Sequence, residues 1–307
     1  MPERSQMMTD WEGYERRHGQ RCIIEDPWAG PVDWRGAPPA EDWFFLLCLG
    51  HSGSCVLSEM LSLHPEVYCA NEDQTILALL GLLTTRTVMS LGSTALHWQS
   101  GLWSGRDKPF TCETRVVTAP FLRDLAEVWR EHYGRGKAFC GDKHTWYLRH
   151  RAELRRIFPG CKLLYTVRHP LDQLSGLMSD EWVGNRAIAD DPKGAWGQIG
   201  CYVRMYREVV CEPDVFIVPY EAFAEPATLA ETMCGCYRRV GASPDDVSEE
   251  QLAGFASRKS VERWRLDSSV LALLDQWRES RLMTEEQEGA LTSSPGEYLR
   301  AITGAEW

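Results

Sequence analysis

The chain lacks a long hydrophobic run. Hydrophobic residues make up 44% of its 307 positions, but no apolar stretch approaches the roughly 20 residues that a membrane-spanning helix needs. The first residues, MPERSQMMTDWEGYERRHGQ, are polar and charged and so predict no secretory signal peptide. We therefore expect a cytoplasmic globular protein that has no membrane as a partner.

An excess of positive charge is also missing. The 33 basic residues are outnumbered by 44 acidic ones, which gives a net charge of −11. Nucleic acids and anionic lipid surfaces attract basic proteins. The charge balance therefore argues against nucleic acid or an anionic membrane as the main partner. It says nothing about the oligomeric state.

Cysteines occur without a regular spacing. There are 11 of them, an odd number, and Cys48, Cys161 and Cys201 lie inside apolar runs. The closest pair, Cys234 and Cys236, has no matching Cys/His set that would complete a zinc site. We expect reduced thiols, as in a cytoplasmic protein, and no metal.

The strongest positive signal is the segment 42–65, DWFFLLCLGHSGSCVLSEMLSLHP. Its apolar run at 43–49 is typical of a strand that is buried on both faces of a parallel sheet. Gly50 and Gly53 allow a sharp turn, and Ser54 is expected to cap the helix that follows. Such a loop presents backbone N–H groups to an anion, although an ordinary strand-to-helix turn has the same signature. The Gly-Lys-Ser/Thr ending of a Walker A motif is missing.

Strands and helices alternate after this segment. The pattern predicts strands at 110–115, 137–141, 162–167 and 214–219. It predicts helices at 121–132, at 149–158, from Pro170 onward and at 226–240. Alternation of this kind predicts an α/β fold with a mainly parallel central sheet flanked by helices.

A second candidate site follows the predicted strand at 162–167. Arg168 stands at the carboxyl end of that strand, where open α/β sheets place ligand contacts. Its guanidinium can bind a phosphate bidentately, and Ser175 on the next helix can add a hydroxyl. An arginine in this place can instead form a salt bridge with a neighbouring carboxylate.

The order of these motifs resembles the sulfotransferase superfamily, with the protein-tyrosine sulfotransferase-like and bacterial branches nearest. The glycine loop is followed by HP at 64–65, an acidic residue at 72, GDK at 141–143 and FPGCKLLYTVRHP at 158–170. VPYE at 218–221 and RKSVERW at 258–264 resemble later motifs of the family, and the likeness covers about residues 42–280.

This resemblance implies a transferase that uses 3′-phosphoadenosine 5′-phosphosulfate (PAPS). The enzyme would move a sulfuryl group from PAPS to a hydroxyl, phenolic or alcoholic, of a small molecule such as a secondary metabolite. The resemblance also implies one α/β domain related to P-loop kinases. We therefore expect a peripheral N-terminal segment at 1–40 and a sulfotransferase-like domain at 41–307.

The family binds the 5′-phosphosulfate with a loop that reads Arg/Lys-Ser-Gly-Thr-Thr. Here the loop reads His51-Ser52-Gly53-Ser54-Cys55, and the resemblance assigns all five residues to the cofactor. The backbone N–H groups of Gly53, Ser54 and Cys55 would cradle the phosphate, while Cys55 lacks the second hydroxyl. His51 stands where the family has a permanent cation beside the leaving group, and an imidazole matches that cation only when it is protonated.

The resemblance assigns catalysis to Glu72 and Lys143, together with His51. In the tyrosine-sulfating branch a glutamate at this spacing accepts the proton of the acceptor hydroxyl; a solvated acid at a helix start is the alternative. Lys143 matches the lysine that reaches the transferring sulfonate, and a surface lysine is its alternative. Trp146 and Tyr147 follow closely and are expected to line the acceptor pocket.

Contacts to the 3′-phosphate are expected from Arg168 and Ser175, with Arg258 and Lys259 as further candidates. The family serine corresponds to position 176, which is a glycine here, so Ser175 comes one residue early. Arg258 and Lys259 fit a solvated basic pair equally well.

The departures at positions 51, 55 and 176 also suit a second interpretation. In that interpretation the protein keeps the sulfotransferase fold, has lost PAPS use, and binds or transforms another ligand in the inherited cleft.

Overall fold

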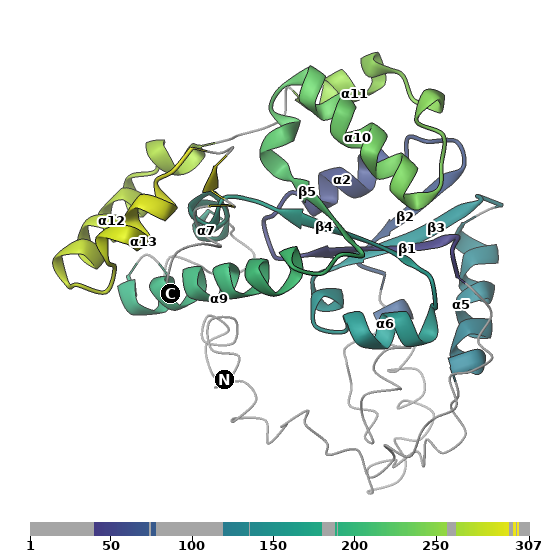
Figure 1. Ribbon diagram of the computed structural model, residues 1–307, viewed down its shortest axis with the longest axis horizontal. Helices are drawn as coiled ribbons and strands as arrows, with labels where there is room; N and C mark the ends of the chain where they lie inside the picture. The colour runs from purple at the N-terminus through teal and green to yellow at the C-terminus, as the bar shows by residue number, and fades with distance from the viewer. Residues whose placement is uncertain are drawn as a thin grey trace, which may run out of the picture.

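A parallel sheet of five strands forms the centre of the computed structural model (Figure 1). The structure describes residues 40–73, 75–77, 119–134, 136–179, 188, 190–256, 262–294, 297, 298 and 300. Across the sheet the strands run in the order β2 (Val67–Asn71), β3 (Phe139–His144), β1 (Trp43–Cys48), β4 (Lys162–Val167) and β5 (Val215–Pro219). Every neighbouring pair is parallel. The predicted α/β fold class is confirmed.

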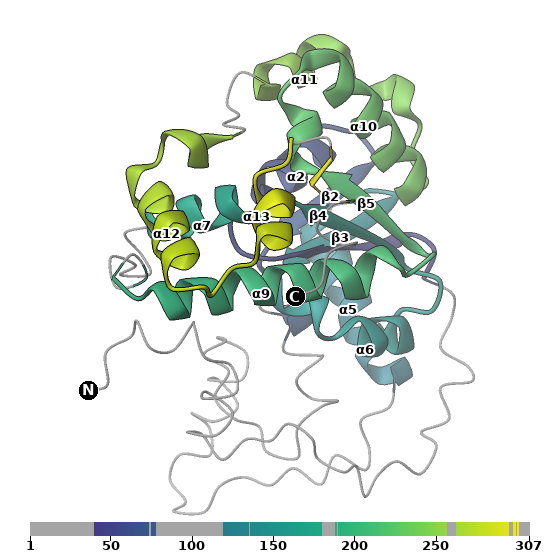
Figure 2. The same ribbon diagram turned by 60° about the vertical axis from the view of Figure 1, so that its left-hand side comes forward.

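Helices cover both faces of the sheet (Figures 1 and 2). One face carries α2 (Ser54–Leu61), α10 (Pro226–Val240) and α11 (Glu249–Ala256), and the other carries α5 (Ala119–Tyr133), α6 (Arg151–Ile157) and α9 (Pro192–Val210). Beside the sheet, α7 (Pro170–Met178) packs on α9 and α12 (Ser268–Glu279), and α13 (Glu285–Leu291) lies next to α12. Short 3₁₀ turns are η3 (Thr145–Leu148), η4 (Tyr220–Phe223), η5 (Pro244–Asp246) and η6 (Arg263–Leu266).

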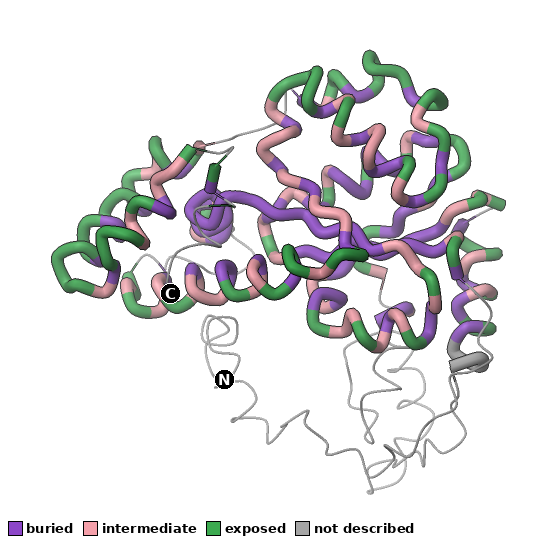
Figure 3. The backbone as a smooth tube through the Cα atoms, in the orientation of Figure 1, coloured by how far each residue is buried: buried purple, intermediate pink, exposed green. Residues whose placement is uncertain are grey.

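The apolar core lies in two layers, one on each side of the sheet. Strand β1 supplies both layers because its side chains alternate: Trp43 and Phe45 pack on the α5 side, whereas Phe44 and Leu46 pack on the α2 side. Every residue of β1 is buried, and in Figure 3 the central strands are buried along most of their length. This double burial explains the unbroken apolar run in the sequence.

Several predicted boundaries are confirmed and others shift. The strand predicted at 162–167 and the helix at 226–240 form at those residues. The strand predicted at 137–141 instead covers Phe139–His144, so the polar sequence Gly-Asp-Lys-His lies within the sheet. The strand predicted at 110–115 and residues 1–39 lie outside the described residues. None of the helices in the described ranges is long and apolar enough to cross a membrane.

Candidate active site

The glycine loop lies at the carboxyl end of β1 and leads into α2. Gly53 has a φ of 86° and forms the N-cap of α2 with no side-chain capping bond. The prediction that Ser54 caps this helix is wrong, because Ser54 is already the first helical residue. A helix start capped by glycine leaves its first N–H groups without a competing side-chain acceptor, which suits an anion cradle.

Three hydrogen bonds hold this loop against the neighbouring strand and helix. Gln173 of α7 donates its side-chain amide to the Gly50 carbonyl at 2.8 Å. The Ser52 hydroxyl donates to Thr166 of β4 at 3.3 Å, and Arg168 Nη1 donates to the His51 carbonyl at 3.0 Å. The loop is therefore fixed by residues that end β4 and begin α7, which joins the two candidate sites of the sequence into one.

Arg168 and the loop also share an aromatic neighbour. The guanidinium carbon of Arg168 lies 4.4 Å from the ring centre of Tyr220, a cation–π contact. The Tyr220 ring also packs against the loop, since a Cβ at Gly53 would lie only 2.0 Å from Tyr220 Cδ2. Arg168, which is 8% exposed, is thus a buried cation placed beside the loop. Sequence reasoning found the motif around Tyr220 but not this role.

Glu72 and Lys143 form an ion pair at the ends of adjacent strands. The Lys143 Nζ lies 2.7 Å from Glu72 Oε1, with the lysine side chain 2% exposed and the glutamate side chain 48% exposed. Burial lowers the pKa of Lys143, but Cys48 and the hydrogen bond to Glu72 raise it, and the pKa ends above its ordinary value. Because its side chain is buried, the alternative that Lys143 is a surface lysine is excluded. Lys143 is a charged group in the sheet, directly beside the candidate base.

Asp142 supports this pair, although sequence reasoning did not single it out. It points to the opposite face of β3, where its Oδ1 accepts the Asp73 N–H at 3.2 Å and its Oδ2 accepts the Tyr147 hydroxyl. Burial raises the pKa of Asp142 to about 7. On the other side, the Glu72 N–H donates to the Lys143 carbonyl at 2.7 Å. These bonds flank Glu72, whose φ is 63°.

The prediction that Tyr147 lines the acceptor pocket is wrong. Tyr147 is fully buried and lies edge-on to Phe45 at 5.4 Å between ring centres, and its hydroxyl donates a hydrogen bond to Asp142. In the 3₁₀ turn η3, consecutive side chains point in different directions. Trp146 consequently faces a cavity while Tyr147 faces the core.

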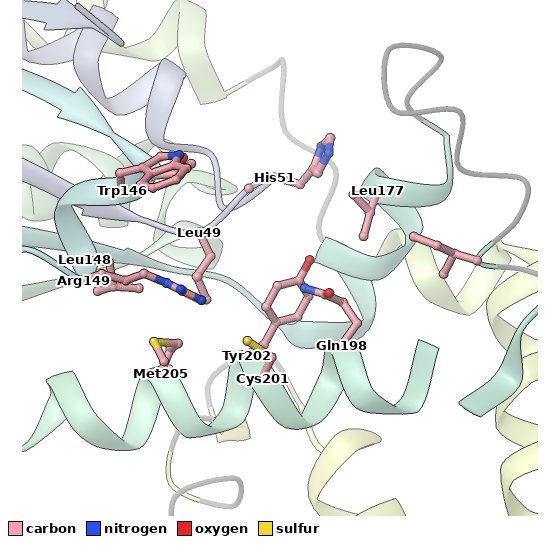
Figure 4. Close-up of a pocket in the computed structure, with 13 residues that line it drawn as sticks. Leu49, His51, Trp146, Leu148, Arg149, Leu177, Gln198, Cys201, Tyr202 and Met205 are labelled. Carbon is pink, nitrogen blue, oxygen red and sulfur yellow. The ribbon is translucent and has the colours of Figure 1, made fainter. Parts of the chain in front are cut away.

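A cavity of about 150 Å³ opens beside the loop, between η3, α7 and α9 (Figure 4). Most of its lining is apolar or aromatic. In Figure 4 the His51 imidazole points away from the centre of this cavity. The ring lies against α7, where a Cβ at Gly176 would come within 3.1 Å of His51 Cβ. The cavity is lined by Leu49, Gly50, His51, Thr145, Trp146, Leu148, Arg149, Leu177, Ile188, Gln198, Cys201, Tyr202 and Met205.

Ser175 is not placed as predicted. Its side chain is buried, and its hydroxyl donates at 2.6 Å to Asp267, the N-cap of α12. Because Ser175 comes one residue before position 176, where the family has its serine, its hydroxyl points toward α12 and not toward the loop. The other predicted contacts at this end, Arg258 and Lys259, lie outside the described residues.

The remaining loop residues differ in exposure. Ser52 and Ser54 are buried, and Cys55 is exposed in the first turn of α2. Among the described residues, no group of three or more His, Cys, Asp or Glu side chains could hold a metal ion. The site as a whole combines the backbone N–H groups at the start of α2, the buried cations Arg168 and Lys143, the carboxylate of Glu72 and an apolar cavity.

Three solved structures resemble the chain at low sequence identity. A sulfotransferase from Alicyclobacillus acidocaldarius is 18% identical with a TM-score of 0.41, over 75% of this chain and 99% of that one. The sulfotransferase domain of the Synechococcus PCC 7002 olefin synthase is 16% identical with a TM-score of 0.40, over 85% and 93%. Sulfotransferase STF9 from Mycobacterium avium is 16% identical with a TM-score of 0.40, over 89% and 81%.

No curated protein matches the chain. The profile of the family described as "Sulfotransferase family", however, matches residues 44–235, which is more than half of the sequence. That range begins in β1 and ends in α10, and it contains the glycine loop, the Glu72–Lys143 pair and Arg168. The chain belongs to the sulfotransferase family.

Proposed function

We propose that the protein transfers a sulfuryl group from PAPS to a hydroxyl, phenolic or alcoholic, of a small molecule. The observation that carries this proposal is the 2.7 Å pair between buried Lys143 and accessible Glu72, set beside a glycine-capped helix start. A charged donor for the sulfonate and a carboxylate for the acceptor proton are the two groups that sulfuryl transfer needs from a protein.

The residues present fit the phosphosulfate end of PAPS. The N–H groups of the first turn of α2 lie at the loop without a side-chain cap, and Gly53 allows Tyr220 to pack directly against the loop because any Cβ would collide with its ring. Arg168 adds a permanent charge beside the loop. When bound, PAPS would supply a sulfuryl group activated by its bond to a phosphate leaving group.

The remaining chemistry falls to Glu72 and Lys143. As the acceptor oxygen bonds to sulfur and the bond from sulfur to the phosphate oxygen breaks, Glu72 takes the hydroxyl proton. Lys143 stabilises the negative charge on the sulfonate oxygens, and its burial strengthens this attraction because little water screens it. We assign His51 a structural part in the loop and no part in the chemical step, since its imidazole lies against α7.

A second candidate function is supported by the other end of the site. Because Ser175 is bonded to Asp267, the family serine that would bind the 3′-phosphate has no counterpart in the described residues. This observation favours the alternative in which the cleft serves a ligand other than PAPS.

Calorimetry with the desulfonated product, 3′-phosphoadenosine 5′-phosphate, separates the two functions. Micromolar binding supports PAPS use, and no binding supports the alternative. Arg168→Ala should weaken binding by about ten- to a hundredfold, since a charge-assisted contact is lost. Arg204→Ala, an exposed arginine on α9, is the matched control and should bind like the parent.

Turnover tests the base. With PAPS and an accepted phenol, Glu72→Gln should lower kcat by roughly 10²–10⁴ because the amide cannot take the proton, while product binding is retained. Asp73→Asn is the control, because its side-chain oxygen can still accept the Thr75 N–H as Asp73 does at 2.7 Å. A Glu72→Gln protein with parental kcat would remove Glu72 from the mechanism.

A further inference from the structure

The cavity beside the loop has the size of one aromatic ring. Its volume of about 150 Å³ equals that of an engineered apolar cavity known to hold benzene. The wall contains an aromatic ring on each side, Trp146 from η3 and Tyr202 from α9, with Leu49 between them (Figure 4). A flat ring can pack on such a wall by offset or edge contacts.

One permanent charge interrupts this apolar lining. Arg149, which is exposed at the surface, is the only lysine or arginine among the thirteen described residues that line the cavity, and none of the thirteen is an aspartate or glutamate. In Figure 4 its guanidinium extends toward the middle of the cavity, near Leu49 and Met205. A guanidinium at an apolar wall favours a planar carboxylate, which it can bind through two N–H groups.

The turn that ends at Arg149 follows directly after the strand that carries the candidate catalytic lysine. Lys143 lies in β3, and η3 follows after His144, whose Nδ1 accepts the Trp146 N–H at 3.1 Å. The Arg149 N–H then donates to the Trp146 carbonyl at 3.1 Å and closes the turn.

Resting on the proposed function, we infer that the acceptor is a phenol with a single ring and a carboxylate. Its ring occupies the cavity between Trp146 and Tyr202, and its carboxylate pairs with Arg149. Its hydroxyl lies at the end of the cavity that Gly50 and His51 of the glycine loop line, from which it must reach Glu72. Proton and sulfuryl transfer then proceed as proposed above, and the carboxylate takes no part in the bonds that change.

Direct binding tests this inference without the donor. The probes are 4-hydroxybenzoate and 4-hydroxybenzamide, which share the ring and the hydroxyl but differ in charge at neutral pH. Their affinities for the full chain are measured by ligand-observed NMR. We expect the acid to bind about tenfold more tightly than the amide. Arg149→Gln should bring the ratio close to one without changing the affinity for the amide, and Arg204→Gln should leave the ratio unchanged.

Each result decides the inference. An acid that binds no better than the amide, or a preference that survives in Arg149→Gln, overturns it. If Arg149→Gln loses both probes, Arg149→Lys decides: the inference stands if the acid preference returns and falls if it does not. Failure of 3′-phosphoadenosine 5′-phosphate to bind would overturn the proposed sulfuryl transfer alone, because the preference for the acid is measured without that nucleotide.

Discussion

Glu72 has a left-handed backbone, which a residue with a side chain adopts at a cost of about 1–3 kcal/mol. Such strain persists only where neighbouring contacts maintain it. Here the Lys143 carbonyl holds the Glu72 N–H from one side, and the Asp142 carboxyl holds the Asp73 N–H from the other. Asp142 is thus a positioning residue for the candidate base.

Asp142→Asn should change how stability depends on pH. Burial raises the folded-state pKa of Asp142 from its ordinary value of 3.8 to about 7, so between these values the folded state holds a proton that the unfolded state releases. The contribution of this carboxyl is complete below about pH 4 and is lost as the pH rises to about 7. The parent should therefore lose stability relative to the variant across that range.

Urea unfolding at several pH values measures this difference, and other carboxyl groups cancel because both proteins share them. Tyr147→Phe serves as a control that removes the hydroxyl bonded to Asp142 but keeps the titrating group. A constant difference between parent and Asp142→Asn would show that Asp142 is ionised throughout the range.

The glycine loop as an element depends on one of its two glycines. Gly53→Ala should destabilise the fold by more than about 2 kcal/mol, because alanine disfavours the left-handed backbone and its Cβ collides with Tyr220. Binding of 3′-phosphoadenosine 5′-phosphate should fall at least tenfold. Gly50→Ala, in the same loop with nothing within 4 Å of its Cβ, should stay within about 0.5 kcal/mol of the parent.

Helix α7 carries a glycine whose absent side chain makes room for the loop. An interior glycine replaced by alanine stabilises a helix by about 0.5–1 kcal/mol, and Gly197→Ala on α9, with open space around it, should show that gain. Gly176→Ala should show less of it, because its Cβ would meet His51 at 3.1 Å. It should also weaken nucleotide binding severalfold.

Thermal unfolding and calorimetry on the two variants check this comparison. Equal stabilisation by both, with parental nucleotide binding, would mean that His51 yields without disturbing the loop. The expected result would explain why two departures from the family pattern occur together: the ring at position 51 takes the space that a side chain at position 176 would fill.

Some elements could be predicted from the sequence because their signals are local. Helix α10 begins with Pro226 and ends at Val240, where Gly241 caps it in a left-handed conformation; a proline at the start and a glycine after the end are strong boundary signals. Helix α9 escaped prediction because Gly194, Gly197 and Gly200 lower its helix propensity. Strand β2 also escaped prediction, although β5, which has the same length of five residues, was predicted.

The site divides along the same line. Arg168 was predicted from its place at the carboxyl end of a strand, where open α/β sheets gather their ligand contacts. Glu72 and Lys143 were predicted from the resemblance to the sulfotransferase family. The bonds of Asp142, the stack on Tyr220 and the cavity position of Arg149 could not be predicted. Each depends on how distant segments pack, and a linear sequence does not state the direction of a side chain within a turn.

Across the whole molecule, helix α7 links the site to the C-terminal helices. Asp172 accepts the backbone N–H groups of Glu262 and Trp264 at 2.9 and 3.0 Å, and Ser175 donates to Asp267 at the start of α12. The same helix reaches the glycine loop through Gln173. The C-terminal helices are therefore held by the helix that also fixes the loop.

Ser175→Ala should lower the stability of the molecule by about 1 kcal/mol, because the Asp267 carboxylate loses a donor. Nucleotide affinity should not change, since the hydroxyl faces α12. Ser179→Ala removes an exposed hydroxyl from the C-cap of the same helix and should change neither quantity. A tenfold loss of nucleotide affinity in Ser175→Ala would show that the serine turns to the 3′-phosphate on binding.

The pair between Glu72 and Lys143 has a kinetic consequence under the proposed function. When no sulfuryl donor is bound, Lys143 and Glu72 are paired with each other, so the carboxylate is not available to accept a proton from the acceptor. An arriving sulfonate competes for the same ammonium group and releases the carboxylate only then. Acceptor activation would wait for the donor, which makes the order of substrate addition a property of one salt bridge.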